Sequence, residues 1–284
     1  MEKDNRVEKR PVTVSTFGDE IAAKLSDQLI VLESHGIWHL ELRSIEGRNV
    51  LDLTESQIRE ARKELRDRGF RLSAIGSPLG KVRLEESFPP ELERLRRAID
   101  LAQFFETPNI RIFSFFIPEK ENPDRYASEV FRRLEKEASL AQSRGVRLLH
   151  ENEARIFGES PERCLKIFEK VPTPALRAVF DPANFVVCGY KSKEAWDMLK
   201  EHVVHFHIKD ARSETKEIVP AGKGDGQVQE ILREAWEGGF DGFLTLEPHL
   251  VVAGESSGFT GPGRFSEAVD ALKEILEKIG AKHR

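Results

Sequence analysis

Short runs of β-branched and aromatic residues alternate along the chain with longer segments in which apolar residues recur every three or four positions. The short runs are typical of strands, and the longer segments are typical of amphipathic helices. Their starts are about 25 to 40 residues apart, the length of one strand–helix unit with its loops. We therefore expect eight strands, at Val12–Phe17, Trp38–Arg43, Arg71–Gly76, Asn109–Phe116, Val146–Glu153, Leu176–Asn184, Val203–Asp210 and Gly242–Pro248.

The segment TESQIREARKELRDRG illustrates the expected helices. Thr54 is a suitable N-cap and Gly69 a suitable C-cap, while Ile58, Ala61 and Leu65 share one face that can pack on a sheet. Similar patterns occur in PELERLRRAIDLAQFF, ASEVFRRLEKEASLAQSRG, SPERCLKIFEKV, KEAWDMLKEH, QVQEILREAWEGG and SEAVDALKEILEKIG.

This alternation predicts an α/β fold, a (β/α)8 TIM barrel that forms one domain over residues 11–284. A doubly wound open sheet is the alternative. That fold favours a glycine-rich turn after an early strand, whereas the first strand here leads into FGDEIA. The charged start MEKDNRVEKR is expected to be a disordered or frayed lead-in over residues 1–10.

The composition argues against a membrane-spanning protein and against a general nucleic-acid binder. The chain has 284 residues, of which 39% are hydrophobic and 33% charged, and its formal net charge is -5. No apolar run approaches the roughly 18 residues needed to cross a bilayer, and a general nucleic-acid binder usually carries a basic surplus. Two widely separated cysteines, Cys164 and Cys188, give no disulfide framework and suit a reducing cytoplasm.

Polar residues interrupt four consecutive strands near their carboxyl ends, which is where the chemistry of a barrel is located. Because alternate strand residues point inward, strand parity places Glu151, Asp181, His207 and Glu247 on the inner side. Three carboxylates and one imidazole in one place require a counter-charge. A divalent cation would supply it; ordinary ion pairs between loops are the alternative.

The motifs HENE, FDPAN, HFHIKD and LEP, in this order, resemble those of the sugar phosphate isomerase/epimerase family, whose members are xylose isomerase-like barrels. Relatives include ketose 3-epimerases, hydroxypyruvate isomerases, inosose dehydratases and an apurinic endonuclease. The resemblance covers nearly the whole chain and is strongest from Val146 to Glu247.

The resemblance implies that Glu151, Asp181, His207 and Glu247 bind one divalent ion, namely Mn, Mg, Co or Zn. In epimerase relatives the two glutamates also act as acid and base, so Glu151 and Glu247 are the expected catalytic pair. Among the relatives the first glutamate of the HENE motif and the second histidine of the HFH motif are the usual ligands. Relatives often carry histidine where this chain has Asn184, and the endonucleases need extra histidines for a three-metal cluster, so DNA repair is not expected.

Six residues are expected to bind substrate. Asn184 has an amide that can hydrogen-bond a hydroxyl group, and the resemblance suggests Arg212. Each of the other four could have a role other than substrate binding. Lys209 could be a surface lysine, and Lys81 could belong to a plain Pro-Gly turn. His249 could simply lie in a loop, and Glu41 could form an ion pair with Arg43. The loop PAGKGDG resembles a phosphate-binding nest, but capping of the next helix by Asp225 or Gly226 is the simpler interpretation.

The expected activity is isomerisation or epimerisation of a sugar, sugar acid or sugar phosphate, by removal of a proton next to a carbonyl through an enediolate. A lyase or hydrolase with the same chemistry, such as a keto-inositol dehydratase or a 3-keto-glycoside-cleaving enzyme, is the first alternative, and a non-catalytic barrel is the second. The expected binding partner is a small carbohydrate, and neither nucleic acid nor a membrane is expected to bind. The expected location of the protein is the cytoplasm. Relatives of this kind are often homodimers or homotetramers.

Overall fold

The computed structural model describes residues 10–253 and 258–284. Eight parallel strands form one sheet in the order β1-β12-β9-β8-β7-β6-β5-β2. Its two edge strands, β1 and β2, meet at a parallel bridge between Phe17 and Glu41, which brings the sheet round into a barrel. The bounds of these strands are β1 Thr13–Thr16, β2 His39–Leu42, β5 Arg71–Ile75, β6 Asn109–Ile112, β7 Arg147–Glu151, β8 Leu176–Phe180, β9 Val203–Ile208 and β12 Phe243–Leu246.

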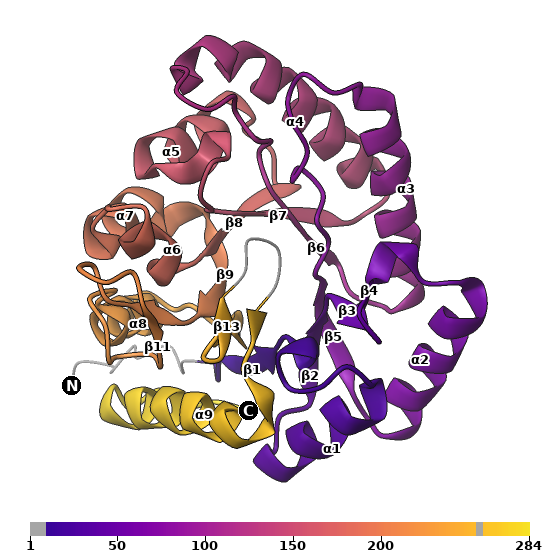
Figure 1. Ribbon diagram of the computed structural model, residues 1–284, viewed down its shortest axis with the longest axis vertical. Helices are drawn as coiled ribbons and strands as arrows, with labels where there is room; N and C mark the ends of the chain where they lie inside the picture. The colour runs from indigo at the N-terminus through magenta and orange to yellow at the C-terminus, as the bar shows by residue number, and fades with distance from the viewer. Residues whose placement is uncertain (1–9, 254–257) are drawn as a thin grey trace, which may run out of the picture.

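The helices surround the sheet, as Figure 1 shows in a view down the barrel. Their bounds are α1 Leu25–His35, α2 Glu55–Asp67, α3 Phe88–Phe104, α4 Ala127–Ser143, α5 Pro161–Lys170, α6 Pro182–Val187, α7 Ser192–Leu199, α8 Val228–Glu237 and α9 Gly261–Lys278. Thr54 forms a capping box at the start of α2, as predicted, and Gly69 follows that helix in the left-handed conformation. The predicted (β/α)8 barrel is confirmed.

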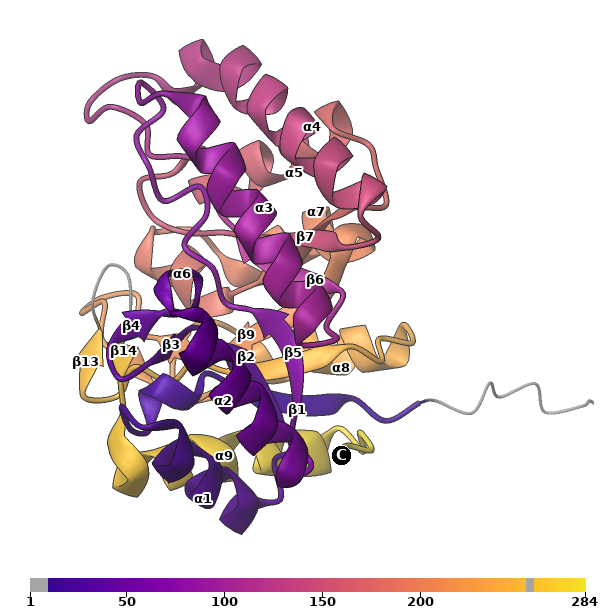
Figure 2. The same cartoon turned by 90° about the vertical axis from the view of Figure 1, so that its right-hand side faces the viewer.

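Three short hairpins follow barrel strands at their carboxyl ends. They are β3 Ser44–Ile45 with β4 Arg48–Asn49, β10 Asp210–Ala211 with β11 Ile218–Val219, and β13 Val252–Ala253 with β14 Gly258–Phe259. Figure 2 shows the first and third hairpins on the same side of the molecule. This side carries the strand ends at which the polar residues were predicted.

The sheet and the helices enclose a continuous apolar layer, because one face of each strand packs outward against helices. On β9, for example, Phe206 contacts the rings of Phe180, Trp196 and Phe240, and on β12 Leu244 and Leu246 are buried in the same layer. The alternate residues of these strands therefore face the barrel axis, as predicted from the alternation of side chains along a strand.

The strands are shorter than their predicted ranges, and two of them end well before the expected residue. The strand expected to reach Phe116 ends at Ile112, and the one expected to reach Asn184 ends at Phe180. The second ends because Asp181 caps α6, whose first residue is Pro182. Of the predicted lead-in, residues 1–9 lie outside the described residues, while Arg10 pairs with Asp241 at 3.4 Å. Within the described ranges, no helix is both long and apolar enough to cross a membrane.

Candidate metal and acid–base centre

Four side chains from consecutive strands converge at the carboxyl end of the barrel. Glu151 ends β7, Asp181 follows β8, His207 lies in β9 and Glu247 follows β12. All four are buried, and one ligand atom from each lies within 4.8 Å of the others. The structure thus brings together the four residues that strand parity predicted, at the predicted end of the barrel.

The negative charge of this cluster is opposed by buried cations. Lys209 Nζ lies 2.6 Å from Asp181 Oδ2 and 2.6 Å from Glu247 Oε2. Burial raises the pKa of Asp181 to about 6, although Lys209 opposes this shift. Burial also disfavours ionisation of Glu247, but Lys209, His249, His207 and Arg43 together hold the pKa of that carboxyl well below its usual range.

The donor set suits a divalent ion. The Asp181 carboxylate caps α6 through Oδ1, which accepts a hydrogen bond from the backbone N–H of Asn184 at 3.0 Å. Among the described residues, Asp181 Oδ2 and His207 Nδ1 are buried without a hydrogen-bond partner, although both lie within ion-pair distance of charged groups. Carboxylate oxygens with one imidazole are ligands that Mn²⁺, Mg²⁺, Co²⁺ and Zn²⁺ accept.

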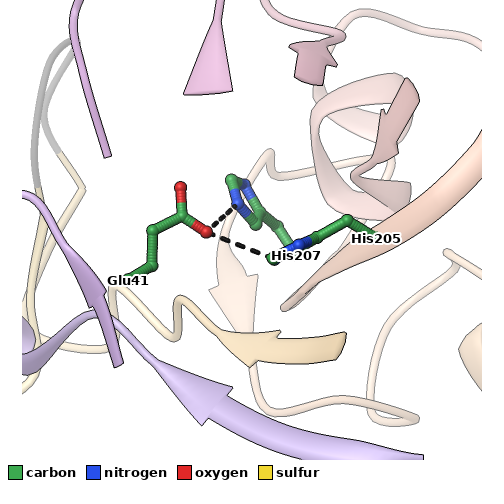
Figure 3. Close-up of side chains that lie close together, drawn as sticks. All are labelled: Glu41, His205 and His207. Atoms are coloured by element: carbon green, nitrogen blue, oxygen red, sulfur yellow. Dashed lines mark hydrogen bonds and ion pairs between the residues drawn. The ribbon is translucent and has the colours of Figure 1, made fainter. Parts of the chain in front are cut away.

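A second layer lies deeper in the barrel, where Glu41 Oε2 is 3.2 Å from Nε2 of both His205 and His207 (Figure 3). His205 Nε2 also lies 2.7 Å from the Thr245 hydroxyl oxygen. His207 Nε2 is therefore engaged by Glu41, and its Nδ1 faces the four-residue cluster, 3.0 Å from Glu151 Oε1. A carboxylate in this position fixes the orientation of a ligating imidazole.

Burial disfavours the charged form of His207, but Glu151 and Glu41 outweigh it and raise the pKa of His207 to about 10. The ring is therefore protonated near neutral pH in the metal-free protein. It has to release that proton before Nδ1 can act as a ligand, because only a neutral imidazole binds a metal.

A family model described as the xylose isomerase-like TIM barrel matches residues 31–278. The chain belongs to the xylose isomerase-like TIM barrel family. A curated relative, an uncharacterised protein of Methanocaldococcus jannaschii, is 24% identical over 200 residues, which are 67% of this chain and 64% of that protein. The match thus spans slightly less than two thirds of the relative's length.

Solved structures of other proteins share the fold. A D-tagatose 3-epimerase-like protein is 19% identical with a TM-score of 0.76, covering 95% of this chain and 98% of that one. The probable 3-DHS dehydratase of petrobactin synthesis from Bacillus anthracis is 17% identical with a TM-score of 0.74, covering 93% and 98%. A barrel from Mycobacterium smegmatis in complex with magnesium is 18% identical with a TM-score of 0.71, covering 96% and 98%.

Three of the six expected substrate-binding residues lie against the cluster. Lys209 bridges Asp181 and Glu247, as described above. Asn184 Nδ2 lies 3.4 Å from Glu151 Oε1 and donates to the Asn152 carbonyl oxygen at 2.9 Å. His249 Nε2 lies 3.7 Å from Glu247 Oε1, while its Nδ1 lies 2.7 Å from Glu20 Oε1.

The other three are placed differently. Lys81 is one step removed, 3.2 Å from Glu153 Oε2 and over the ring of Phe113. Arg212 pairs with Glu217 at 3.2 Å, and its side chain is 53% exposed, so it is not drawn into the cluster. Glu41, expected to bind substrate or to pair with Arg43, is fully buried beneath His207. It is positioned to hold histidines rather than to meet a substrate.

Two arginines contact the glutamates of the site, and neither was among the residues expected to bind metal or substrate. Arg43 was expected to pair with Glu41; instead its guanidinium donates to Asp19 at 2.8 Å, Glu20 at 2.9 Å and Glu247 at 3.0 Å. Arg111 lies in β6 and its Nη1 is 3.3 Å from Glu151 Oε2. The available signal was a charged residue inside the apolar run NIRIF, because a buried arginine in a strand is rare without an acidic partner.

The glycine-rich loop PAGKGDG binds a carboxylate of its own chain. Asp210 accepts hydrogen bonds from the backbone amides of Gly222 at 3.0 Å, Gly224 at 3.1 Å and Gly226 at 2.8 Å. The predicted cap of the following helix was wrong: α8 begins after Gln227, and Asp225 instead accepts from Ser213. The nest is thus filled by Asp210, which leaves these amides unavailable to a phosphate.

Proposed function

We propose that this protein is a divalent-metal-dependent isomerase or epimerase of a sugar, sugar acid or sugar phosphate. The reaction would transfer a proton at a carbon next to a carbonyl, through an enediolate. The observation that carries the proposal is the pairing of Glu151 and Glu247 in one buried cluster with Asp181 and His207. Two carboxylates in such a cluster suit a reaction that needs one group to remove a proton and another to return it.

In this proposal Glu151, Asp181, His207 and Glu247 hold the ion. When bound, a divalent ion would polarise the carbonyl and stabilise the negative charge that develops on the substrate oxygens. Glu151 and Glu247 have pKa values lowered by their cationic neighbours in spite of burial, so both are ionised near neutral pH and able to accept a proton. Lys209, which contacts Asp181 and Glu247, is placed to meet a substrate oxygen.

A lyase that uses the same proton abstraction is the second candidate. The same pair of carboxylates would expel a leaving group on the next carbon, as in dehydration of a keto-inositol or cleavage of a 3-keto-glycoside. The observation that favours keeping this candidate is the Lys209 ammonium, a buried cation 2.6 Å from Glu247 Oε2. A fixed positive charge beside the base can stabilise the negative charge that develops on a departing hydroxyl oxygen.

The proposal is tested by metal content and by exchange with solvent deuterium. Purified protein, with Glu151→Gln and Glu247→Gln variants, is analysed for bound metal and assayed against ketoses, sugar phosphates and keto-inositols in D2O. An isomerase or epimerase incorporates deuterium at the reacting carbon with no loss of water, whereas a lyase releases water or an alcohol. Full metal content and full activity in both variants would refute the site.

A further inference from the structure

The environment of Arg111 is unusual for a buried arginine. Its side chain is about 5% exposed, and its guanidinium carbon lies 5.1 Å from the ring centre of Phe17 and 4.9 Å from that of Phe113. Nε and Nη2 point toward the backbone carbonyl oxygens of Ser77 and Gly76, at 3.3 and 3.4 Å. Rings and carbonyls thus fix the plane of the guanidinium and leave Nη1 directed at the cluster.

The two carboxylates nearest Nη1 each divide their oxygens between two neighbourhoods. Glu151 Oε1 and Glu247 Oε2 face His207 Nδ1, at 3.0 and 3.6 Å. The remaining oxygens, Glu151 Oε2 and Glu247 Oε1, which we call the outer oxygens, face Arg111 Nη1 instead, at 3.3 and 3.9 Å. Glu247 Oε1 also accepts a hydrogen bond from Arg43 Nη1 at 3.0 Å. One guanidinium nitrogen therefore lies beside the outer oxygen of both glutamates.

We propose that Arg111 is a positioning residue that holds the outer oxygen of Glu151, and shares that of Glu247 with Arg43, for proton transfer. This inference rests on the proposed function, because it takes these glutamates as the acid–base pair. If the inner oxygen of each glutamate is used as a ligand, the outer one is free to exchange a proton with substrate. Two such negatively charged oxygens repel each other. A planar cation with a permanent charge offsets this repulsion and fixes the positions of both oxygens.

A purely structural role for Arg111 makes a different prediction, and the chain supplies a matched control. Arg133 is also a buried arginine over two rings, 5.0 Å from Phe88 and 5.3 Å from Phe115. It bonds Glu129 on its own helix and the carbonyl oxygens of Leu84 and Glu86, with no contact to the cluster among the described residues. Its loss removes a comparable buried guanidinium without touching the site.

The experiment compares Arg111→Gln, Arg111→Lys and Arg133→Gln. For each variant, kcat and KM are measured on the substrate found in the deuterium screen, and Co²⁺ affinity is measured from the visible absorption of the bound ion. We expect Arg111→Gln to lower kcat about 100-fold, within the range of general acid–base contributions, with KM and Co²⁺ affinity changed less than about threefold. Arg111→Lys should recover about tenfold of that loss, and Arg133→Gln should keep kcat.

Two results would overturn the proposal: an unchanged kcat in Arg111→Gln, or a parallel loss of kcat and Co²⁺ affinity, which a structural role predicts. If Arg111→Gln does not fold, Arg111→Lys decides through the same readouts. If the wild-type protein is inactive on every substrate, the proposed function fails, and crystal structures of the variants decide about Arg111. An outer oxygen of Glu151 that keeps its wild-type place without the guanidinium would then refute it, and a displaced one would support it.

Discussion

The ammonium nitrogen of Lys209 lies 2.6 Å from Oδ2 of Asp181, at the centre of a group of buried carboxylates. Because Oδ1 of Asp181 is committed to capping α6, Oδ2 is the oxygen that remains for a ligand role. A divalent ion in the cluster would share that oxygen with Lys209. Lys209 and the metal ion would therefore each neutralise part of the negative charge of Asp181. How much each cation stabilises the protein can be measured.

We expect Lys209→Met to make the stability of the protein depend more strongly on metal. Removing one partner of a buried ion pair costs about 3–5 kcal/mol, since the remaining charge is left uncompensated. The metal-free variant should lose stability in this range, and saturating Mn²⁺ should restore most of it. Urea unfolding with EDTA or with Mn²⁺ measures both effects.

The matched control for this prediction is Lys193→Met, which removes a lysine paired with Asp197 at 2.7 Å on the outside of α7. That change should alter stability by less than about 1 kcal/mol and leave the effect of Mn²⁺ as in the wild type. A Lys209→Met protein whose gain from Mn²⁺ is no larger than that of the wild type would contradict the idea that the two cations share Asp181.

Glu41→Gln should weaken metal binding without altering any of the four ligands. Glu41 engages Nε2 of His207 and so fixes the ring with Nδ1 toward the cluster. Loss of such an outer partner typically lowers metal affinity about 10- to 100-fold. Competition with a chelator of known affinity measures the change. Glu91→Gln removes another buried carboxylate, outside the site, and should leave the affinity unchanged; equal affinities in the two variants would speak against this role for Glu41.

Features with a local cause could be predicted from the sequence. Alternation along a strand decides which side chains face the barrel axis, so strand parity was enough to place Asp181 and His207 inward. The carboxyl ends of parallel strands meet at one end of a barrel, which was sufficient to group Glu151 and Glu247 although they are far apart in the chain.

Features that depend on the relative rotation of strands could not be predicted. Arg43 was correctly placed near the carboxyl end of its strand, but its choice of Asp19, Glu20 and Glu247 over Glu41 depends on how β1 and β2 close the barrel. Likewise, no sequence pattern shows that Arg111 lies over the ring of Phe17, because that contact joins β6 to the end of β1 across the intervening strands β2 and β5. Long side chains reach partners that periodicity does not specify.

Asp210→Ala should loosen the loop that precedes α8. Its carboxylate accepts hydrogen bonds from the backbone amides of Gly222, Gly224 and Gly226. A hydrogen bond to a charged group contributes roughly 1.5–3 kcal/mol to stability. We expect a loss of about 2–3 kcal/mol in the free energy of unfolding, and faster proteolysis within residues 220–226. Asp210→Asn keeps one acceptor and should lose less; equal losses would show that the charge is unimportant.

A substitution at Gly224 should disturb the same contacts between this loop and Asp210. A Cβ at this position would lie 2.4 Å from the Ala211 carbonyl oxygen and 2.6 Å from Asp210 Oδ1. Gly224→Ala should therefore push the loop away from Asp210 and reproduce most of the loss seen in Asp210→Ala. Because the two changes remove the same contacts, their effects should not add in the double variant, and full additivity would mean that the two residues act separately.

Glu137 makes folding stability depend on pH at a place remote from the cluster. It lies in α4, it is only 3% exposed, and its Oε1 has no hydrogen-bond partner among the described residues. Burial, with a smaller contribution from Glu91, raises the pKa of Glu137 well above its ordinary value of 4.5, although Arg133 opposes the shift. The folded protein therefore favours the protonated carboxyl.

For a carboxyl whose pKa is raised by folding, the stabilising contribution is full below the unfolded value near 4.5 and is lost as pH rises toward the folded value. We therefore expect Glu137→Gln, which stays neutral, to gain stability over the wild type as pH rises from 5 to 8. Over the range in which the folded carboxyl is protonated and the unfolded one is ionised, the gain should grow by about 1.4 kcal/mol per pH unit. Urea unfolding at several pH values measures it, with Glu135→Gln on the exposed side of the same helix as control. A difference between Glu137→Gln and the wild type that stays constant across this range would show that Glu137 does not titrate there.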